Sequence, residues 1–270
     1  MKHELIRGKG GRPIPCEYEI KGDEKLVILV VHGLGSSKES DIALRLYQNF
    51  PAAGVGVCSF DYPGHGNSPS DDYLVKNCLS DLADVDAYVR KLAPHAEVAY
   101  FGSSFGVYSS LLYLKDKIAE DRKEGRDVTY RVFSRSGAVS MPDLMEKSTA
   151  DQTDALQKDG WFWLNWGFAR SVKITAEYLQ ELKENDLFKI YAAGEDSLAK
   201  NLHMVMVHGE ADDLIPVEGA LDFAELVDAD ITVVPGGDHR LSIPGGPQLV
   251  VEKAKNFFEI RATQNQKTVV

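Results

Sequence analysis

The sequence is poor in cysteine. Cys16, Cys58 and Cys78 are the only three cysteines among its 270 residues, and they lie far apart along the chain. They have neither the paired spacing of a zinc site nor the even number of a disulfide framework. We therefore expect free, mostly buried thiols, and their pattern predicts no metal site.

Long apolar runs and an excess of positive charge are also missing. No run approaches the roughly 20 residues that span a bilayer, and residues 1–7 offer only Leu5 and Ile6 where a signal peptide needs a longer apolar stretch. Lys and Arg number 30 against 41 Asp and Glu, for a formal net charge of -11. A nucleic-acid partner is disfavoured, because affinity for phosphates comes from clustered basic residues. We expect a cytoplasmic protein without a membrane span.

What remains is the composition of an ordinary soluble globular protein, with 44% hydrophobic and 26% charged residues. Strand-like and helix-like stretches alternate, which indicates an α/β fold with a mostly parallel sheet and right-handed crossovers. A hairpin is expected over 4–20. The expected strands are 26–31, 55–60, 97–101, 128–134, 203–207 and 231–235, and the expected helices are 39–50, 79–93, 105–118, 217–227 and 247–259.

The alternation is interrupted once, between residues 141 and 202. We expect 1–140 and 203–262 to build one core, 141–202 to form a small helical lid inserted into it, and 263–270 to be a flexible tail. In the helix over 79–93, apolar residues recur three or four apart, so one stripe should face the sheet. Asp81, Asp84, Asp86 and Arg90 fall outside that stripe and can face water.

One short motif carries the sharpest chemical signal. Residues 102–106 read Gly-Ser-Ser-Phe-Gly, a G-x-S-x-G pattern between a strand-like run and a helical stretch. A tight turn of this kind strains the backbone of its serine, and the flanking glycines remove side chains that would collide. The helix that follows stabilises negative charge at its N-terminus. Ser104 is the predicted nucleophile, because its neighbour Ser103 lacks glycines in register.

A serine hydroxyl needs an imidazole to take its proton and a carboxylate to orient that imidazole. The loop after the strand over 203–207 carries three acidic residues, and Asp212 is the predicted triad acid. Asp213 and Glu210 remain nearby alternatives. Two glycines after the last strand let a loop turn His239 back over the sheet edge, so His239 is the predicted general base. The chain order Ser, Asp, His differs from that of chymotrypsin and of subtilisin.

Two backbone N–H groups should stabilise the charge that develops on a substrate carbonyl oxygen. Phe105 is expected to donate one of them. The loop 32–37 after the first buried strand should supply the other, with Leu34 as the donor. We interpret His32 in the same loop as a structural histidine. This machinery requires no cofactor and no metal.

Together these segments resemble the α/β-hydrolase superfamily over nearly the whole chain. The resemblance rests on His32-Gly33-Leu34-Gly35, Asp61-Tyr62-Pro63-Gly64-His65-Gly66-Asn67-Ser68, Gly102–Gly106, His208–Pro216 and Gly237-Asp238-His239. It implies the α/β-hydrolase fold with Ser104, Asp212 and His239 as triad, and it implies that residues 61–68 form a structural turn. Within the superfamily, the chain resembles small bacterial carboxylesterases related to cinnamoyl and feruloyl esterases. It is also similar to serine aminopeptidase-like and monoacylglycerol lipase-like hydrolases.

The expected lid contains all three tryptophans of the chain. Trp161, Trp163 and Trp166 lie in one aromatic run over 161–168. The pair Trp163 and Trp166 has helical spacing, so the rings could pack a lid helix onto the sheet. Alternatively, some of the rings contact the acyl or alcohol part of an apolar or aromatic ester, since aromatic walls are typical of small-ligand sites.

The leading hypothesis for function is ester hydrolysis through an acyl-enzyme, with a small-molecule ester as the partner. An aminopeptidase or a monoacylglycerol lipase-like hydrolase is the alternative, because the same machinery cleaves amides and esters. A hypothesis from another class is a non-catalytic ligand-binding protein with this fold. Such a protein would be expected to lose a member of the triad, and the sequence lacks none. The sequence leaves open whether the protein forms a homo-oligomer.

Overall fold

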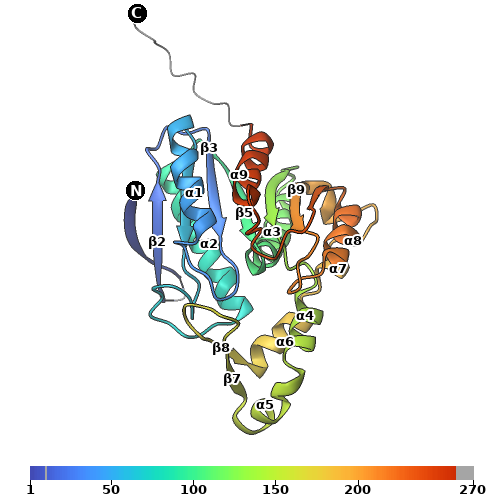
Figure 1. Ribbon diagram of the computed structural model, residues 1–270. Coiled ribbons are helices and arrows are strands. Elements are labelled where there is room, and N and C mark those ends of the chain that lie inside the picture. Colours follow the sequence, from blue (N-terminus) through green and yellow to red (C-terminus); the bar gives the residue numbers. More distant parts are fainter. Residues whose placement is uncertain (10, 260–270) are drawn as a thin grey trace, which may run out of the picture.

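An eight-stranded sheet forms the centre of the molecule (Figure 1). The structure is a computed structural model that describes residues 1–9 and 11–259, so the predicted tail 263–270 lies outside the described residues. The strands of this sheet are β1 (Lys2–Arg7), β2 (Pro13–Glu19), β3 (Leu26–Val31), β4 (Gly56–Phe60), β5 (Glu97–Ser103), β6 (Tyr130–Arg135), β9 (Leu202–Gly209) and β10 (Asp230–Val234).

The order of the strands across the sheet is β1-β2-β4-β3-β5-β6-β9-β10. The strands from β4 to β10 are parallel, and the predicted N-terminal hairpin β1–β2 adds to them in antiparallel fashion through β4. Strand β3 consists only of Leu, Val and Ile and is buried throughout, as expected for a parallel strand that is covered on both faces. The fold is therefore the predicted α/β-hydrolase fold.

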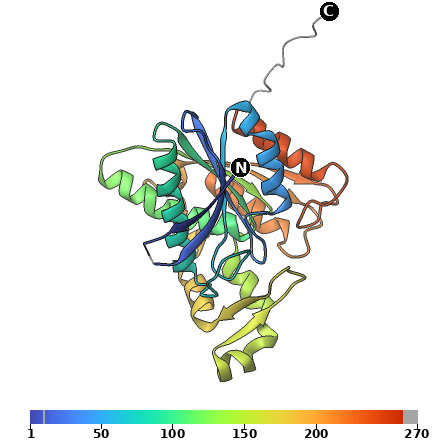
Figure 2. The ribbon, with the colours of Figure 1, turned by 90° about the vertical axis from the view of Figure 1, so that its left-hand side faces the viewer.

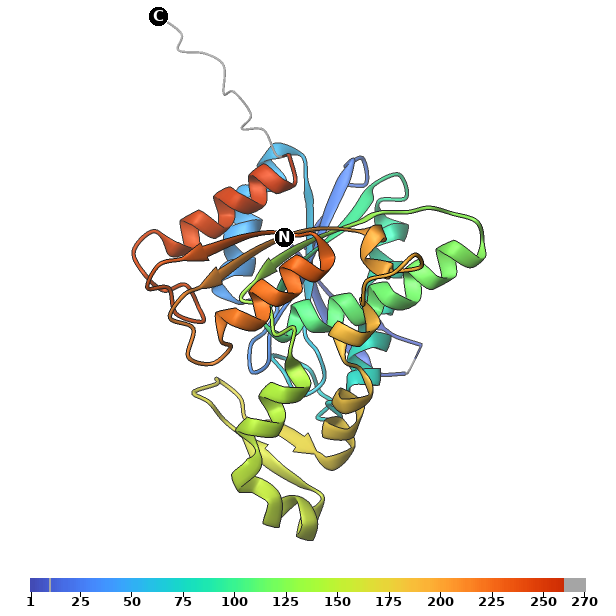
Figure 3. The same ribbon diagram turned by 90° about the vertical axis from the view of Figure 1, so that its right-hand side faces the viewer.

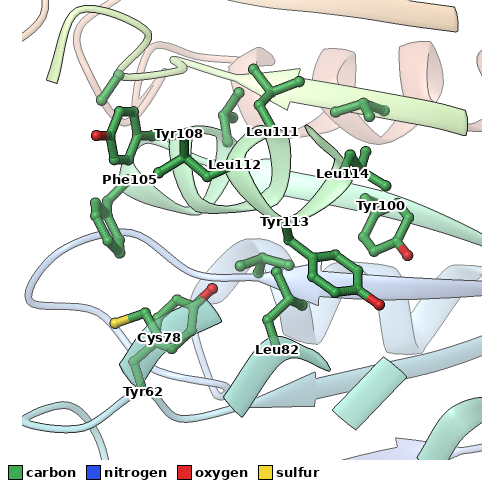
Figure 4. Packing of buried hydrophobic residues seen from close by; sticks show 14 of the residues in the cluster. Tyr62, Cys78, Leu82, Tyr100, Phe105, Tyr108, Leu111, Leu112, Tyr113 and Leu114 are labelled. Atoms are coloured by element: carbon green, nitrogen blue, oxygen red, sulfur yellow. The ribbon is translucent and has the colours of Figure 1, made fainter. Parts of the chain in front are cut away.

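Helices cover both faces of the sheet. Helices α1 (Asp41–Asn49) and α9 (Gly246–Phe257) lie on one face, where they enclose the smaller of two apolar clusters (Figure 2). Helices α2 (Val75–Leu92), α3 (Phe105–Lys123) and α8 (Val217–Val227) enclose the larger cluster on the other face. Figure 4 shows part of this cluster, which includes Leu82 of α2 and Leu112 of α3.

The prediction that Asp81 and Asp86 of α2 face water is wrong, because both are 3% exposed. The Asp86 carboxylate accepts hydrogen bonds from the hydroxyls of Tyr100 and Tyr113, at 3.0 and 2.9 Å. Asp81 forms an ion pair of 2.9 Å with Arg12 from the N-terminal hairpin. These partners come from other elements, so the periodicity of the helix alone could not reveal them.

The segment 141–202 projects from the sheet at the bottom of Figures 1 and 3, except for its last part, where residues 187–190 pack against helix α8. It contains four helices and a small hairpin: α4 (Met141–Ser148), α5 (Thr153–Asp159), β7 (Trp161–Leu164), β8 (Val172–Thr175), α6 (Ala176–Glu184) and α7 (Leu187–Ile190). Short 3-10 turns occur at Pro51–Ala53, Ala150–Gln152 and Leu198–Asn201. Within the described ranges, no helix has the length and apolar character needed to cross a membrane.

The prediction of a helix for the aromatic run is wrong. Residues 161–164 form strand β7, which pairs with β8 in antiparallel fashion. Their burial follows the period of two that a strand imposes: Phe162 and Leu164 are buried, whereas Trp163 on the opposite side is 52% exposed. The segment is therefore a mixture of helices and a hairpin.

Candidate active site

The predicted triad residues and oxyanion donors all follow strands of the central sheet, whereas the three predicted tryptophans lie in or next to β7 of the separate hairpin. Ser104 follows β5, the loop 32–37 follows β3, Asp212 follows β9 and His239 follows β10. These strands are parallel, so their carboxyl ends lie at the same edge. Strand β4 pairs with one side of β3 and β5 pairs with the other side, so the carboxyl end of β3 is a topological switch point. Open α/β sheets bind ligands at such points.

Ser104 occupies the strained position of a strand-to-helix turn. Its φ of 52° lies in the left-handed region that few residues other than glycine adopt. Two backbone hydrogen bonds hold the residue there: its N–H donates to the carbonyl of Arg135 at 3.0 Å, and its carbonyl accepts from the N–H of Ala138 at 3.2 Å. Such strain persists only where the surroundings enforce it, and it is concentrated at functional sites.

The two glycines of the motif are required by close contacts. A Cβ atom on Gly106 would lie 2.0 Å from the carbonyl oxygen of Val31, and one on Gly102 would lie 2.7 Å from the backbone nitrogen of Val107. Any side chain at either position would push α3 away from β3 and β5. The glycines thus allow the turn that presents Ser104.

His239 and Asp212 are joined by a hydrogen bond. The distance between Nδ1 of His239 and Oδ2 of Asp212 is 2.8 Å. The other oxygen of this carboxylate, Oδ1, accepts from the N–H groups of Leu214 and Ile215 at 3.1 and 2.8 Å. The Asp212 side chain is fully buried and that of His239 is 21% exposed. Because Nδ1 of His239 faces the carboxylate, Nε2 is the nitrogen available for proton transfer.

Another glycine brings these two loops together. A Cβ atom on Gly209, at the end of β9, would lie 2.2 Å from the carbonyl oxygen of Gly237 and 2.6 Å from that of Asp238. The N–H of Ala211 also donates to the carbonyl of Gly237 at 2.9 Å. The loop that carries His239 therefore lies directly on the loop that carries Asp212.

The carboxyl group of Asp212 is held in its charged form. Burial acts to raise its pKa, but hydrogen bonds from His208 and His239 and from the backbone N–H of Ile215 outweigh burial, so the pKa lies below its usual value. Asp212 is therefore a carboxylate at neutral pH. A carboxylate in this position accepts the Nδ1 proton of His239 and favours the tautomer in which Nε2 is a base.

The structure brings Ser104 to the same edge but gives no hydrogen bond between its hydroxyl and His239 among the described residues. Both residues are half-buried. In enzymes without substrate, hydrogen bonds between reacting groups are often long and shorten when the substrate binds.

The predicted oxyanion donors lie beside Ser104. Phe105 is the first residue of α3, so its N–H has no partner within the helix. The loop after β3 approaches closely, since a Cβ atom on Gly33 would lie 2.9 Å from the Cβ of Ser104. Leu34 is the next residue and is half-buried.

The residues that the sequence predicts to be structural make internal contacts. His32 accepts the backbone N–H of Tyr62 on Nε2 at 3.1 Å, and its Nδ1 lies 2.8 Å from the carbonyl oxygen of Gly33. Asp61 accepts the backbone N–H groups of Lys38 and Asn67 at 2.7 and 2.9 Å. These contacts join the loop after β3 to the loop after β4.

Sequence reasoning missed Phe168, in the loop between β7 and β8. Its ring lies directly on Gly35 of the loop after β3, where a Cβ atom would be 2.1 Å from the ring carbon Cγ. Asn165 shapes the β7–β8 loop by accepting the N–H groups of Gly167 and Phe168, both at 2.9 Å. The Asn-x-Gly turn sequence was the available signal for this loop.

Arg170 fixes the same loop to the core. Its guanidinium donates to the carbonyl oxygens of Ser68 and Gly66, at 2.9 and 3.4 Å, and to the carboxylate of Asp71. The segment 141–202 therefore contacts the core at the loop that carries Leu34 and at the loop after β4.

The three tryptophans lie in two environments. Trp161 and Trp163 contact each other edge to face at 5.7 Å on the outward side of the hairpin, and the Lys173 ammonium lies 4.7 Å from the ring centre of Trp161. Trp166 instead contacts the ring of Phe168, at 5.9 Å. Only Trp166 is thus connected through Phe168 to the loop beside Ser104. Among the described residues, no group of three or more His, Cys, Asp or Glu side chains could hold a metal ion.

A serine at a strained strand-to-helix turn, with a His–Asp pair on the loops after the last two strands of the sheet, defines the α/β-hydrolase class of protein. The profile of the alpha/beta hydrolase family matches residues 28–253. The chain therefore belongs to the alpha/beta hydrolase family and is a hydrolase. No curated protein sequence matches it significantly.

Solved structures share the fold over nearly their whole length. A protein from Agrobacterium vitis S4 that carries a provisional hydrolase assignment has a TM-score of 0.78 and 22% identity, over 96% of this chain and 99% of that one. Est1E from Butyrivibrio proteoclasticus, solved with bound ferulic acid, has a TM-score of 0.74 and 17% identity, over 95% and 98%. Alpha/beta hydrolase domain-containing protein 10 from mouse has a TM-score of 0.69 and 16% identity, over 96% and 99%.

Proposed function

We propose that this hydrolase is a serine carboxylesterase that cleaves its substrate through an acyl-enzyme. The observation that carries the proposal is the 2.8 Å hydrogen bond between His239 and the buried carboxylate of Asp212, at the sheet edge where Ser104 is held at a φ of 52°. A nucleophile, a base and an orienting acid are then within one site.

In the proposed reaction, the Oγ of Ser104 attacks the ester carbonyl carbon while Nε2 of His239 takes the hydroxyl proton. His239 then protonates the leaving alcohol, and the acyl group stays on Ser104. Water attacks this acyl-enzyme with His239 again as base, which releases the carboxylic acid. Asp212 holds the imidazole in the required tautomer and stabilises its protonated form.

The N–H groups of Leu34 and Phe105 are the proposed oxyanion donors. Phe105 lies at the N-terminus of α3, where the helix dipole adds to the stabilisation of negative charge. The close approach of Gly33 to Ser104 supports Leu34 as the second donor. Removal of one such donor typically costs about 10²- to 10³-fold in kcat.

The segment 141–202 is the proposed lid over this site, inserted between the core parts 1–140 and 203–262. Phe168 contacts the loop of Leu34, which supports a role of the β7–β8 loop in the site. We further propose that tryptophans of the lid contact an apolar or aromatic ester, with Trp166 in the position that the structure supports best and with Trp161 and Trp163 farther along the hairpin. The fold likeness to Est1E with bound ferulic acid makes a cinnamoyl-type acyl group the first substrate to try.

A fluorophosphonate probe tests the nucleophile without knowledge of the substrate. Wild type should be labelled at Ser104 and Ser104→Ala should not be labelled. Ser103→Ala is the matched control, because it removes the same hydroxyl from the adjacent residue and should still be labelled. Labelling that persists in Ser104→Ala and is lost in Ser103→Ala would refute the assignment.

A substrate panel then tests the reaction. We expect hydrolysis of p-nitrophenyl and cinnamoyl esters and much slower hydrolysis of aminoacyl amides. Faster cleavage of the amides would favour the aminopeptidase alternative, and a preference for monoacylglycerols would favour the lipase-like one. If the protein is not labelled and also hydrolyses none of these substrates, the proposed function is contradicted.

A further inference from the structure

A second histidine contacts the carboxylate of Asp212. Nε2 of His208, at the end of β9, lies 3.3 Å from Oδ2 of Asp212, the same oxygen that faces His239. Nε2 of His208 also lies 2.8 Å from the carbonyl oxygen of Ile215. A carbonyl oxygen can only accept a hydrogen bond, so Nε2 of His208 carries the hydrogen. The single Nε2–H of His208 therefore faces two acceptors, the carbonyl oxygen of Ile215 at 2.8 Å and Oδ2 of Asp212 at 3.3 Å, and Oδ2 has an imidazole nitrogen from each of two histidines beside it.

The burial of this group makes the second donor consequential. The side chains of Asp212 and His208 are 0% and 1% exposed. Water therefore cannot offset the loss of either donor. The backbone N–H groups of Leu214 and Ile215 bond to Oδ1, so among the described residues only the two histidines share Oδ2.

A histidine at position 208 is less favourable for stability than an apolar residue would be, if the side chain only fills space in the core. Its Nδ1 is buried and has no hydrogen-bond partner among the residues that the structure describes. A buried polar atom without a partner costs free energy that an apolar side chain of similar size would avoid. The favourable contacts of the ring are the two at Nε2, and one of them is to the proposed triad acid.

We propose that His208 is a positioning residue of the active site: its Nε2–H fixes the Asp212 carboxylate and weakens the attraction of that carboxylate for the proton of His239. The inference rests on the proposed function, because it gives His208 a role through Asp212. A hydrogen bond to a carboxylate oxygen draws electron density from it, so an oxygen with two donors binds each of them less strongly. His239 can then return its proton to the leaving group more readily.

Three substitutions test this role. His208→Leu removes the donor, and His208→Gln keeps an N–H group on a side chain of similar reach. His203→Gln is the matched control, since His203 lies on the same strand and is exposed. The charge of Arg135, which acts on Asp212 from β6, is retained in every variant.

The first readout is the NMR titration of the His239 ring, assigned from the spectrum of His239→Gln. We expect the titration midpoint in His208→Leu to move to higher pH by roughly half to one unit, because Asp212 then attracts the proton of His239 more strongly. The midpoint in His208→Gln should stay near that of wild type, and His203→Gln should have no effect. A folded His208→Leu with an unchanged midpoint would overturn the proposal.

The second readout is the pH profile of kcat/KM with an ester. The acidic limb of His208→Leu should move in the same direction as the NMR midpoint, and kcat should fall about tenfold, the scale of a misplaced supporting group rather than of a lost reacting group. His208→Gln should restore most of the loss. A merely structural role would lower thermal stability and leave the acidic limb in place.

Two provisions keep the test decisive. If His208→Leu fails to fold, His208→Asn replaces it, because its shorter amide cannot reach Asp212, and the same shift of the midpoint is expected. The NMR titration needs no turnover, so it decides on His208 by itself. A wild-type protein without fluorophosphonate labelling or ester cleavage would instead refute the proposed function.

Discussion

Two neighbouring serines at the end of β5 present the same hydroxyl group in different surroundings. Ser103 is 7% exposed, and its Oγ is buried without a hydrogen-bond partner in the described part of the chain. Ser104 is half-buried and lies at the left-handed turn before α3. The backbone of the turn, and not the chemistry of the side chain, thus distinguishes the proposed nucleophile from its neighbour.

Ser104→Ala should lower kcat for ester hydrolysis by about 10⁶-fold, the scale on which a triad nucleophile contributes. Ser103→Ala should keep a kcat near that of wild type, since the Ser103 hydroxyl is buried. Steady-state kinetics with a p-nitrophenyl ester measures both. A Ser104→Ala enzyme that retains a tenth of wild-type turnover would contradict the assignment.

Position 209 has no room for a side chain, so it requires glycine. An alanine Cβ would lie 2.2 Å from the carbonyl oxygen of Gly237 and would push the loop of His239 away from Asp212. Gly209→Ala should therefore lower kcat by about 10²-fold, as expected when reacting groups move apart by about an ångström. Steady-state kinetics and a thermal melt should be recorded on the same preparation.

Gly219→Ala in α8 serves as the control for this substitution. Its Cβ would approach only the flexible hydroxyl of Ser140, at 3.0 Å, and alanine is the better helix former. It should keep its activity. Equal activity of the two variants would show that the contact between the two loops does not matter for the reaction.

At the scale of elements, the β7–β8 loop connects the proposed lid to the core. Phe168 covers Gly35, Arg170 anchors the loop to the core, and Trp166 contacts Phe168. Trp166 is therefore nearer than the two outward tryptophans to the loop that carries Leu34. A substrate held by Ser104 would meet this side of the hairpin first.

Trp166→Ala should raise KM for aromatic esters severalfold while kcat changes less, because it removes the proposed apolar contact with the acyl group in the ground state and the transition state alike. Trp163→Ala is the control, since Trp163 is 52% exposed and lies on the outward side of the hairpin. Kinetics on a cinnamoyl ester and on an acetyl ester compares the two variants. If Trp163→Ala has the larger effect on KM, the substrate lies on the other side of the hairpin.

The core elements could be predicted from sequence because each has a local signal. The uniformly apolar run 26–31 is β3, and Pro216 precedes the helix that runs over Val217–Val227 as expected. The end of α3 could not be predicted, because the helix continues to Lys123 through polar residues that are as common in helices as in loops. The family profile and the solved structures confirm the fold that follows from these elements.

The lid could not be predicted in the same way. A run of four residues such as 161–164 fits a period of two and a period of 3.6 equally well, and only its pairing with β8 decides. The contact of Phe168 with Gly35 joins residues that are distant in the chain and has no signature in either segment. For the site itself, motif and chain order pointed to Ser104, Asp212 and His239, but the contact of His208 with Asp212 requires coordinates.

At the scale of the whole molecule, the loops after β3 and β4 are held by buried histidines. His65 is 1% exposed and packs its ring against those of His32 and Tyr73, at 5.1 and 4.8 Å. Burial, together with repulsion from His32, lowers the pKa of His65 to about 3. Burial likewise lowers the pKa of His32. The native loops therefore require neutral histidines, which links their packing to pH.

The sign of this linkage follows from the pKa of His65 in the two states. The unfolded chain takes up a proton at His65 below pH about 6.5, the ordinary value for histidine, whereas the folded protein does so only near pH 3. Between these values the unfolded state binds more protons, so the free energy of unfolding falls as the pH falls. Between pH 7 and pH 5, the protonation of His65 in the unfolded chain should alone lower the free energy of unfolding by about 2 kcal/mol.

His65→Gln should abolish this share of the pH dependence, because glutamine does not titrate. The measurement is urea unfolding of wild type and variant at pH 7 and pH 5, and the quantity to compare is the loss of unfolding free energy between the two pH values. Any constant cost of the substitution cancels in that difference. The control is His95→Gln, at an exposed loop position. Its free energy of unfolding should fall between pH 7 and pH 5 by as much as that of wild type. A His65→Gln protein with the same loss as wild type would show that His65 is protonated in the folded state and that the loops accommodate its charge.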